Sequence, residues 1–430
     1  MSNIEVVLTG IGIISPIGND LGTYWDSLCN GVSGIRRLSS ISTAYDELRP
    51  YGGEVGDFRA KELIMPRKNI KLMTRDIQMA VVAAVHACRD AGLQTADLDK
   101  TDFVRNVPPE RIGVNFGADL IGAEVPALLD AFKAGITGDS YDFSTWGKGR
   151  ETIAPLWMLK HLPNMPSCHI TIANGAMGPS NTVMVCRGSC LASIFEGIRT
   201  IQRGIADVMI CGAVGNRINP DFLSRGRSYS LAPDSYGNAV PRPFDTERCG
   251  SVLAEGAGVY VIESRKFAEA RGVKIRAALD GFAATTEAQM HGEKPTGEAI
   301  RRAIRTAIER CSRTTPDEIG HVNADGLGTI NDDRAEAEAI NAELGGIPVT
   351  AVKGATGNSG AGSGAVELAA AVLALENKLL PPTCNHTVTA ADCPVNVVHG
   401  KPLAVDKPAA IKLNQTYTGR SFALVIRRES

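Results

Sequence analysis

The chain has 430 residues, which is long enough to bury a large core and to form two or three domains. Hydrophobic residues make up 44% of it and charged residues 21%, as is ordinary for a soluble globular protein. The net charge of −2 gives no electrostatic reason to expect nucleic acid or an anionic membrane as a partner. No run approaches the ~20 apolar residues of a membrane-spanning helix.

The cysteines and the first residues bear on the compartment. The start of the chain, Met1-Ser2-Asn3-Ile4-Glu5, lacks the basic region of a secretory signal. Ten cysteines without such a signal are most simply reduced thiols in a cytosol, so a cytoplasmic location is expected. No Cys-x-x-Cys pair is present, and neither a metal site nor a cofactor is expected.

In chain order, apolar runs typical of strands alternate with helical patterns, which indicates an α/β layered architecture. The stretch from about 99 to 166 is rich in loops and aromatic residues. Residues 187–204 predict a helix, 207–212 a buried strand, and 365–373 a second buried helix. The apolar face of the first helix carries Leu191, Ile194, Phe195, Ile198 and Ile201.

Short motifs recur over nearly the whole chain. In order they are Val6-Val7-Leu8-Thr9-Gly10-Ile11-Gly12 with Ser15-Pro16-Ile17-Gly18, Trp25, Gly31-Val32-Ser33-Gly34-Ile35, Gly178-Pro179-Ser180, Arg242-Pro243-Phe244-Asp245 with Arg248, Glu255-Gly256-Ala257-Gly258, Asn323-Ala324-Asp325-Gly326-Leu327-Gly328-Thr329 with Asn331-Asp332, Lys353-Gly354-Ala355-Thr356-Gly357-Asn358, and Pro381-Pro382-Thr383. Any one of them alone is weak, but the set is specific.

Together these motifs resemble those of the β-ketoacyl-carrier-protein synthases, the condensing enzymes with a thiolase-type fold. The resemblance implies two similar halves packed as α/β/α/β/α layers, here residues 1–264 and 265–430. It also implies that the insertion at about 99–166 forms cap and dimer-contact elements.

In that family, a nucleophilic cysteine opens a helix eight residues beyond the proline of the Gly-Pro-Ser turn. Counting from Pro179 gives Arg187. The family's helix also runs to a glycine seventeen residues past the nucleophile, and counting back from Gly204 gives Arg187 again. The resemblance therefore implies that arginine occupies the nucleophile position.

The same comparison of motifs gives Asp325 for the first catalytic histidine of the family and Asn358 for the second. Lys353 is retained, and Glu367 matches the acidic residue that usually pairs with that lysine. A buried unpaired charge costs several kcal/mol. We therefore expect an Arg187–Asp325 ion pair, with Asn358 completing its hydrogen bonds.

Other groups near these motifs offer no clear replacement for the family's chemistry. Cys186 is the alternative nucleophile, but Cys186 and Cys190 are both interpreted as packing thiols. His321 is expected to point the same way as Asn323, by strand alternation. His291 is interpreted as a surface residue, and the remaining five histidines as structural or solvated.

The family's glycine-rich oxyanion loop corresponds here to Gln415-Thr416-Tyr417-Thr418-Gly419, with Tyr417 at the oxyanion-loop position. Two family glycines are replaced by threonine. A backbone conformation that is open to glycine is therefore not expected at these two positions.

Three functions are compatible with these residues. The first is a non-catalytic partner of an active ketosynthase, resembling the chain-length factors of type II polyketide systems, in a heterodimer or a homodimer that meets acyl carrier protein. The second is an active synthase or decarboxylase with an unconventional site. The third is a stand-alone protein that binds acyl chains or carrier protein, with Arg187 clamping a carboxylate or phosphate. Loss of the imidazoles favours the first.

Overall fold

The computed structural model describes residues 4–41, 50–95, 105–121, 125–219, 222, 231–232, 240–288 and 295–429. His291 and the first residues of the predicted insertion, up to residue 104, lie outside these ranges. No helix in the described ranges is both long enough and apolar enough to cross a membrane.

One sheet of eleven strands runs through the molecule and is built from two halves. The N-terminal half holds, in spatial order, β7 (Ser180–Val183), β4 (Ile112–Ala118), β8 (Val208–Asn216), β9 (Glu255–Ser264) and β1 (Val6–Ile14). The C-terminal half continues with β10 (Ala277–Thr286), β17 (Arg420–Arg428), β16 (Ala409–Gln415), β11 (Ile319–Asn323), β12 (Pro348–Thr350) and β14 (Asn396–Val397). The halves join through a short antiparallel contact in which Val7 faces Ala278 and Leu8 faces Ala277.

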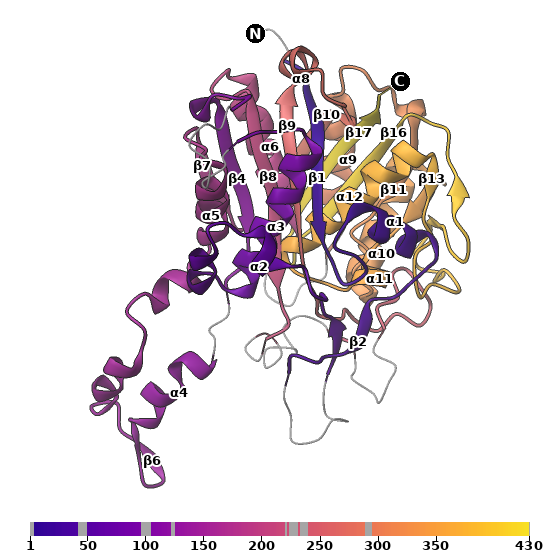
Figure 1. Cartoon of the computed structure of the whole chain (residues 1–430). Helices are drawn as coiled ribbons and strands as arrows, with labels where there is room; N and C mark the ends of the chain where they lie inside the picture. The colour runs from indigo at the N-terminus through magenta and orange to yellow at the C-terminus, as the bar shows by residue number, and fades with distance from the viewer. Residues whose placement is uncertain are drawn as a thin grey trace.

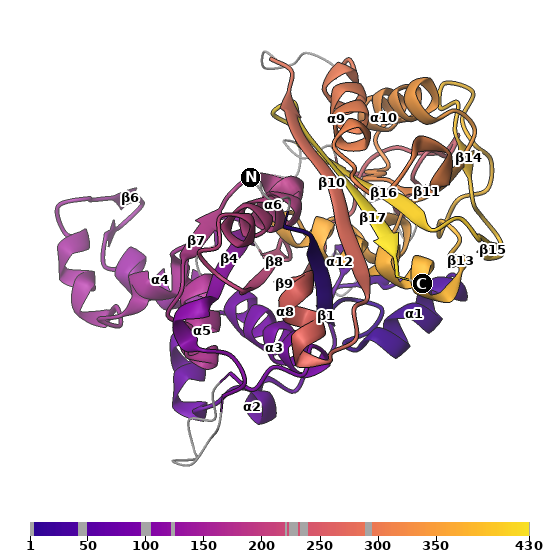
Figure 2. The ribbon, with the colours of Figure 1, turned by 90° about the horizontal axis from the view of Figure 1, so that it is seen from above.

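Helices form the layers on either side of these strands (Figures 1 and 2). The outer face of the N-terminal half is covered by α3 (Arg75–Asp90) and α5 (Met165–Asn174), and that of the C-terminal half by α9 (Glu298–Glu309) and α10 (Ile330–Leu344). Between the halves lie α6 (Ser189–Gln202) and α12 (Ala361–Asn377). The predicted α/β/α/β/α layering is thus confirmed.

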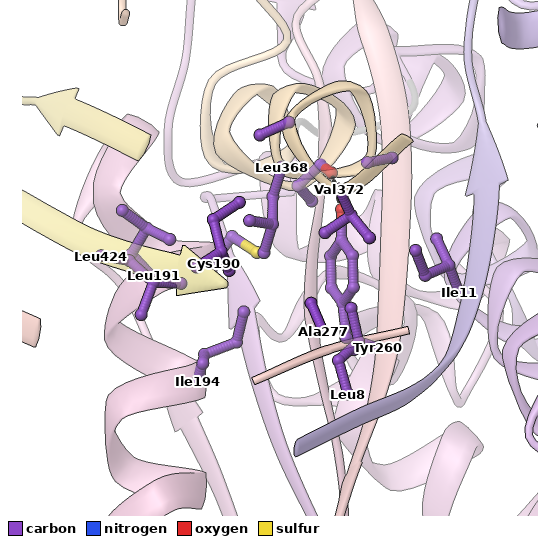
Figure 3. Packing of buried hydrophobic residues seen from close by; sticks show 14 of the residues in the cluster. Leu8, Ile11, Cys190, Leu191, Ile194, Tyr260, Ala277, Leu368, Val372 and Leu424 are labelled. Carbon is purple, nitrogen blue, oxygen red and sulfur yellow. Dashed lines mark hydrogen bonds between the residues drawn. The ribbon is translucent and has the colours of Figure 1, made fainter. Parts of the chain in front are cut away.

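The two helices of the central layer have mostly apolar sequences because both are buried between the halves. Residues 361–375 of α12 are all buried, because this helix contacts α6 and strands of both halves. The five apolar residues predicted on the helix after Arg187 are buried on α6. Figure 3 shows Leu191 and Ile194 of α6 packed near Leu368 and Val372 of α12. Burial of this apolar surface is the main force that holds the two halves together.

Smaller elements complete the described chain. They are α1 (Leu21–Cys29), β2 (Ile35–Arg37), β3 (Tyr51–Gly53), α2 (Ala60–Leu63), the 3-10 helix η2 (Arg67–Leu72), the 3-10 turns η3 (Pro109–Arg111) and η6 (Cys186–Gly188), α8 (Arg265–Arg271), the 3-10 turn η8 (Pro316–Glu318), α11 (Lys353–Thr356), β13 (Leu379–Leu380) and β15 (Leu403–Ala404), with those of the projecting segment described next.

Residues 125–163 form a segment that projects away from the layers, and we call it the arm (Figures 1 and 2). It contains α4 (Val125–Lys133), the hairpin β5 (Ile136–Thr137) and β6 (Ser140–Tyr141), and two 3-10 helices, η4 (Trp146–Thr152) and η5 (Trp157–His161). The arm lies within the insertion that the sequence predicts at about 99–166.

Candidate functional site

The residues matched to catalytic positions meet between the two halves of the fold. Arg187 lies in η6, the 3-10 turn that connects β7 to α6. The next residue has to be small, because a Cβ on Gly188 would sit 2.2 Å from the ring of Phe422 on β17. The turn η6 therefore packs directly against β17 of the C-terminal half. The Arg187 side chain is only 4% exposed.

The predicted ion pair is present. Nε of Arg187 donates to Oδ2 of Asp325 at 2.9 Å, and Asp325 is completely buried in the loop after β11. Burial alone would raise the pKa of Asp325, but Arg187 and the neighbouring lysines outweigh that effect and lower it. Burial alone would lower the pKa of Arg187, but the adjacent Asp325 and Cys186 outweigh burial and raise that pKa. Both groups are therefore charged at neutral pH.

Lys353 holds the other side of the same carboxylate. Its Nζ lies 2.9 Å from Oδ1 of Asp325 and donates to the Asp325 carbonyl oxygen at 2.7 Å. It also donates to Oε1 of Glu367 on α12, so the predicted lysine–glutamate pair is confirmed. One buried ammonium thus joins two buried carboxylates, as buried charges require.

Two residues of β16 complete this network, and the sequence analysis missed both. Nζ of Lys412 lies 2.8 Å from Oε2 of Glu367. The side-chain amide of Asn414 donates to Asp325 and to Glu367, at 2.9 Å each. A signal was available, because Lys412 and Asn414 are two residues apart in a strand whose other residues up to position 414 are apolar, and so they share one face.

Two further carboxylates on α10 fix the loop that carries Asp325. Glu336 accepts the backbone N–H groups of Asp325 and Gly326, at 2.7 and 2.8 Å. Asp333 accepts those of Gly328 and Phe244. Burial raises the pKa of Glu336 to about 8 and that of Asp333 to about 7.

The expected role of Asn358 was wrong. Its Oδ1 accepts from the backbone N–H of Gly360 at 3.1 Å and from the hydroxyl of Ser363 at 3.3 Å. The amide thus turns back onto the start of α12, and the backbone of Asn358 is fixed by an isolated parallel bridge to Leu253, just before β9. Asn414 takes the expected place beside Asp325, and Nη2 of Arg187 is buried without a hydrogen-bond partner.

The remaining candidates lie apart from the network. Tyr417 is in the turn between β16 and β17 and is 66% exposed. Cys190 is fully buried in the core, where burial raises its pKa far above the usual value, so its interpretation as a packing thiol is confirmed (Figure 3). Cys186 is only partly buried, and its sulfur accepts a hydrogen bond from Arg217.

No histidine in the described part of the chain takes part in the network. His321 is buried on the same strand as Asn323, and neither side chain has a hydrogen-bond partner. No hydrogen bond or ion pair in the described ranges joins a histidine to Arg187, Asp325 or Lys353. Nor does any group of three or more histidine, cysteine and acidic side chains among those residues form a potential metal site.

The layered fold has two halves, and a buried charge network lies between them at the start of α6. These features define a thiolase-like protein of the ketosynthase class. Solved structures agree. The ishigamide ketosynthase/chain length factor superposes with a TM-score of 0.84 at 28% identity, over 99% of this chain and all of that one. A β-ketoacyl synthase from Burkholderia phymatum superposes with a TM-score of 0.85 at 23% identity over the same shares, which supports the fold alone.

The chain belongs to the β-ketoacyl synthase family. The family's N-terminal domain matches residues 3–268 and its C-terminal domain residues 276–387. A 3-oxoacyl-[acyl-carrier-protein] synthase 2 from Synechocystis sp. is 33% identical over the full length of both chains. The protein of the same name from Staphylococcus aureus is 29% identical over 99% of each.

Proposed function

We propose that this chain is a non-condensing ketosynthase subunit that works as the chain-length-factor-like partner of an active ketosynthase, in polyketide or fatty-acid-type biosynthesis. The observation that carries the proposal is the Arg187–Asp325 ion pair. Condensation of this class needs a nucleophilic thiol and imidazoles that move protons near neutral pH. At the three matched positions the chain has a guanidinium, a carboxylate and an amide. None of these groups replaces the nucleophilic thiol or the proton-transferring imidazoles.

The charge network supports this assignment because each of its two buried carboxylates is held by two basic side chains. Arg187, Lys353 and Lys412 share the two carboxylates of Asp325 and Glu367, and every one of these side chains is buried. A neutral histidine at 325 would leave the neighbouring cations without that countercharge. The network is therefore adapted to the absence of the catalytic residues and stabilises the junction of the two halves.

An open strand edge supports a protein partner of the same fold. β7 is the last strand of the sheet at the N-terminal side, and its residues are exposed or only partly buried. Such an edge presents unpaired backbone donors and acceptors to a second chain. Two exposed methionines flank it, Met177 three residues before its first residue and Met184 directly after its last.

The arm adds a large apolar surface beside this edge. Its exposed apolar residues are Leu129, Phe132, Ile136, Tyr141, Phe143, Trp146, Leu156, Met158 and Leu162. Phe143 is 83% exposed, and apolar surface of this extent marks an interaction site. We assign edge and arm together to the interface with the active ketosynthase.

A cationic surface supports an encounter with acyl carrier protein. The exposed residues of α2, η2 and their flanks include Arg59, Lys61, Arg67, Lys68 and Lys71. A ketosynthase of the same fold is described in complex with its type II acyl-carrier protein. Clustered positive charge steers an acidic partner to its docking site.

Co-expression with a ketosynthase that has intact Cys, His and His tests the proposal. The expected result is a one-to-one heterodimer by size exclusion and mass spectrometry. Condensation is expected only when the intact ketosynthase is present. A homodimer that ignores the partner, or release of carbon dioxide from malonyl-carrier protein by this chain alone, would overturn the proposal. The second outcome would favour the active-synthase alternative.

A further inference from the structure

A pocket lies on the seam between the two halves, at the end of α6 that is farther from Arg187. Its volume is about 220 Å³. The N-terminal half lines it with residues 4–6, at the start of β1, and with two side chains of α6. The C-terminal half lines it with residues of β10 and of the chain after α9. Because α6 is 14 residues long, about 20 Å separate the pocket from the charge network.

Two arginines line this pocket with most of their hydrogen-bond donors unused. Arg199 lies in the last turn of α6 and Arg310 directly follows α9, where the helix dipole favours a cation. Nη1 of Arg199 donates to the side chain of Gln202 at 3.1 Å, and Nη1 of Arg310 donates to the carbonyl oxygen of Phe282 at 3.1 Å. Neither guanidinium has an ion-pair partner within the described ranges. Since a guanidinium carries five N–H donors, both retain donors for a ligand.

The two acidic residues of the pocket are already occupied. Glu5 forms ion pairs with Arg265 and Arg313. Asp280 accepts hydrogen bonds from the backbone N–H and the hydroxyl of Ser312, at 2.8 and 2.9 Å, and from the backbone N–H of Arg313. Neither carboxylate therefore supplies the countercharge that the two free guanidinium groups lack.

An aromatic ring holds one of these guanidinium groups in place. The guanidinium carbon of Arg199 lies over the ring of Phe282, 5.0 Å from its centroid. The ring of Phe282 in turn packs on that of Phe195, with centroids 4.7 Å apart. Because the guanidinium is positioned before a ligand arrives, less conformational entropy is lost on binding.

We propose that this pocket binds a small organic anion whose carboxylate or phosphate group is held by Arg199 and Arg310. A guanidinium binds either group through two parallel hydrogen bonds. The buried side chains of Val6 and Leu279 form an apolar wall of the same pocket. An apolar cavity of about 150 Å³ is enough to take benzene. The ligand therefore has room for a ring beside its charged group.

A ligand in this position contacts both halves of the fold, because Arg199 belongs to the N-terminal half and Arg310 to the C-terminal half. Binding to the folded chain alone stabilises it against unfolding by mass action. β1 begins at the top of Figure 1, whereas the arm extends from the lower left, so the proposed interface with the ketosynthase leaves the pocket open. The inference goes beyond the proposed function and does not depend on it.

The test uses the full-length chain and three probes of similar size, benzoate, phenyl phosphate and the neutral benzamide. Calorimetric titration at low ionic strength measures the Kd, and thermal unfolding measures the stabilisation. We expect at least one of the two anions to bind saturably and to raise the Tm. Benzamide should bind about tenfold more weakly or less, because it lacks the charge that strengthens hydrogen bonds to a guanidinium.

Variants of the two arginines locate the binding. Arg199→Gln and Arg310→Gln should each weaken binding of the anion about tenfold, since each removes a charge-assisted contact. Arg203→Gln is the matched control, because Arg203 is exposed just after α6, does not line the pocket and carries the same charge. Its Kd should equal that of the wild type. Capture of the partner ketosynthase should be unchanged in all three variants.

Three results would overturn the proposal: no saturable binding of either anion, benzamide that binds as tightly as benzoate, or the same loss of affinity in Arg203→Gln as in Arg199→Gln. A preference for one of the two anions supports the proposal and identifies the charged group of the ligand. If a variant does not fold, the salt dependence of binding to the wild type decides. An affinity for the anion that does not fall with added salt counts against the proposal.

Discussion

Nζ of Lys412 lies 2.8 Å from Oε2 of Glu367, and neither side chain is more than 1% exposed. Lys353 binds the other oxygen of the same carboxylate. One acidic residue on the central helix α12 therefore serves lysines from α11 and β16. This arrangement joins three elements of the C-terminal half at the point where Arg187 of the N-terminal half enters.

Lys412→Met is expected to lower the free energy of unfolding by about 3 kcal/mol, because removing one partner of a buried ion pair leaves charge uncompensated. Urea unfolding of the isolated chain measures the change. Lys401→Met, at an exposed position, is the control and should have little effect. A change of less than ~0.5 kcal/mol for Lys412→Met would show that Glu367 does not depend on the second lysine.

Arg187 and Asp325 are expected to be strongly coupled. Asp325→Asn should destabilise the chain by about 3–5 kcal/mol, because Arg187 loses its countercharge and Lys353 loses one of its two. The double variant Arg187→Met/Asp325→Asn should be less destabilised than the sum of the single variants. Equilibrium unfolding of the four proteins gives the coupling energy, and additive effects would mean that the ion pair contributes no net interaction.

His321 should make the protein sensitive to mild acid. Burial lowers its pKa from 6.5 to about 4. The folded state therefore binds fewer protons than the unfolded state between these values, and stability is lost as the pH falls from about 6.5 to about 4. The full loss is about 3 kcal/mol.

Unfolding of wild type and His321→Phe at a series of pH values checks this expectation. The ring of phenylalanine has a similar size and no proton to gain, so the variant should lose less stability between pH 6.5 and 4. Parallel profiles for the two proteins would rule out His321 as a source of the acid sensitivity.

Substitutions on the arm should separate partner binding from stability. Phe132→Ser/Phe143→Ser/Trp146→Ser should abolish co-purification with the active ketosynthase, because buried apolar area at an interface drives association. The thermal unfolding of the isolated chain should change little, since these side chains are exposed. Ile205→Ser/Val388→Ser removes exposed apolar groups elsewhere and should leave the partner bound. Equal loss of binding in both variants would exclude a specific role for the arm.

Several elements were predictable from the chain alone. The strand expected at 207–212 is β8, and the helix expected at 365–373 is part of α12. Both are apolar runs that the fold buries on every side, so local pattern and tertiary packing agree. The Arg187–Asp325 pair was also predictable, because the resemblance to the β-ketoacyl synthases implied that both residues lie at the same site.

The errors and omissions concern side chains whose partners come from distant segments. Asn358 was expected beside Arg187, but its backbone is fixed by the bridge to Leu253 and its amide bonds to the start of α12. Asn414 and Lys412 were missed because nothing near them in the sequence identifies Asp325 and Glu367 as their partners. Which residues meet depends on the order in which β11, β16 and α12 pack.

The sequence by itself determined the alternation of strands and helices, which follows from its apolar pattern, while the resemblance of its motifs to those of the β-ketoacyl synthases implied the layering, the two halves and the residues at the matched positions. Only the tertiary structure decided how the buried charges are compensated and which thiol lies beside a guanidinium. Those outcomes depend on distances of about 3 Å between groups that are up to 138 positions apart in the chain, and no local pattern specifies them.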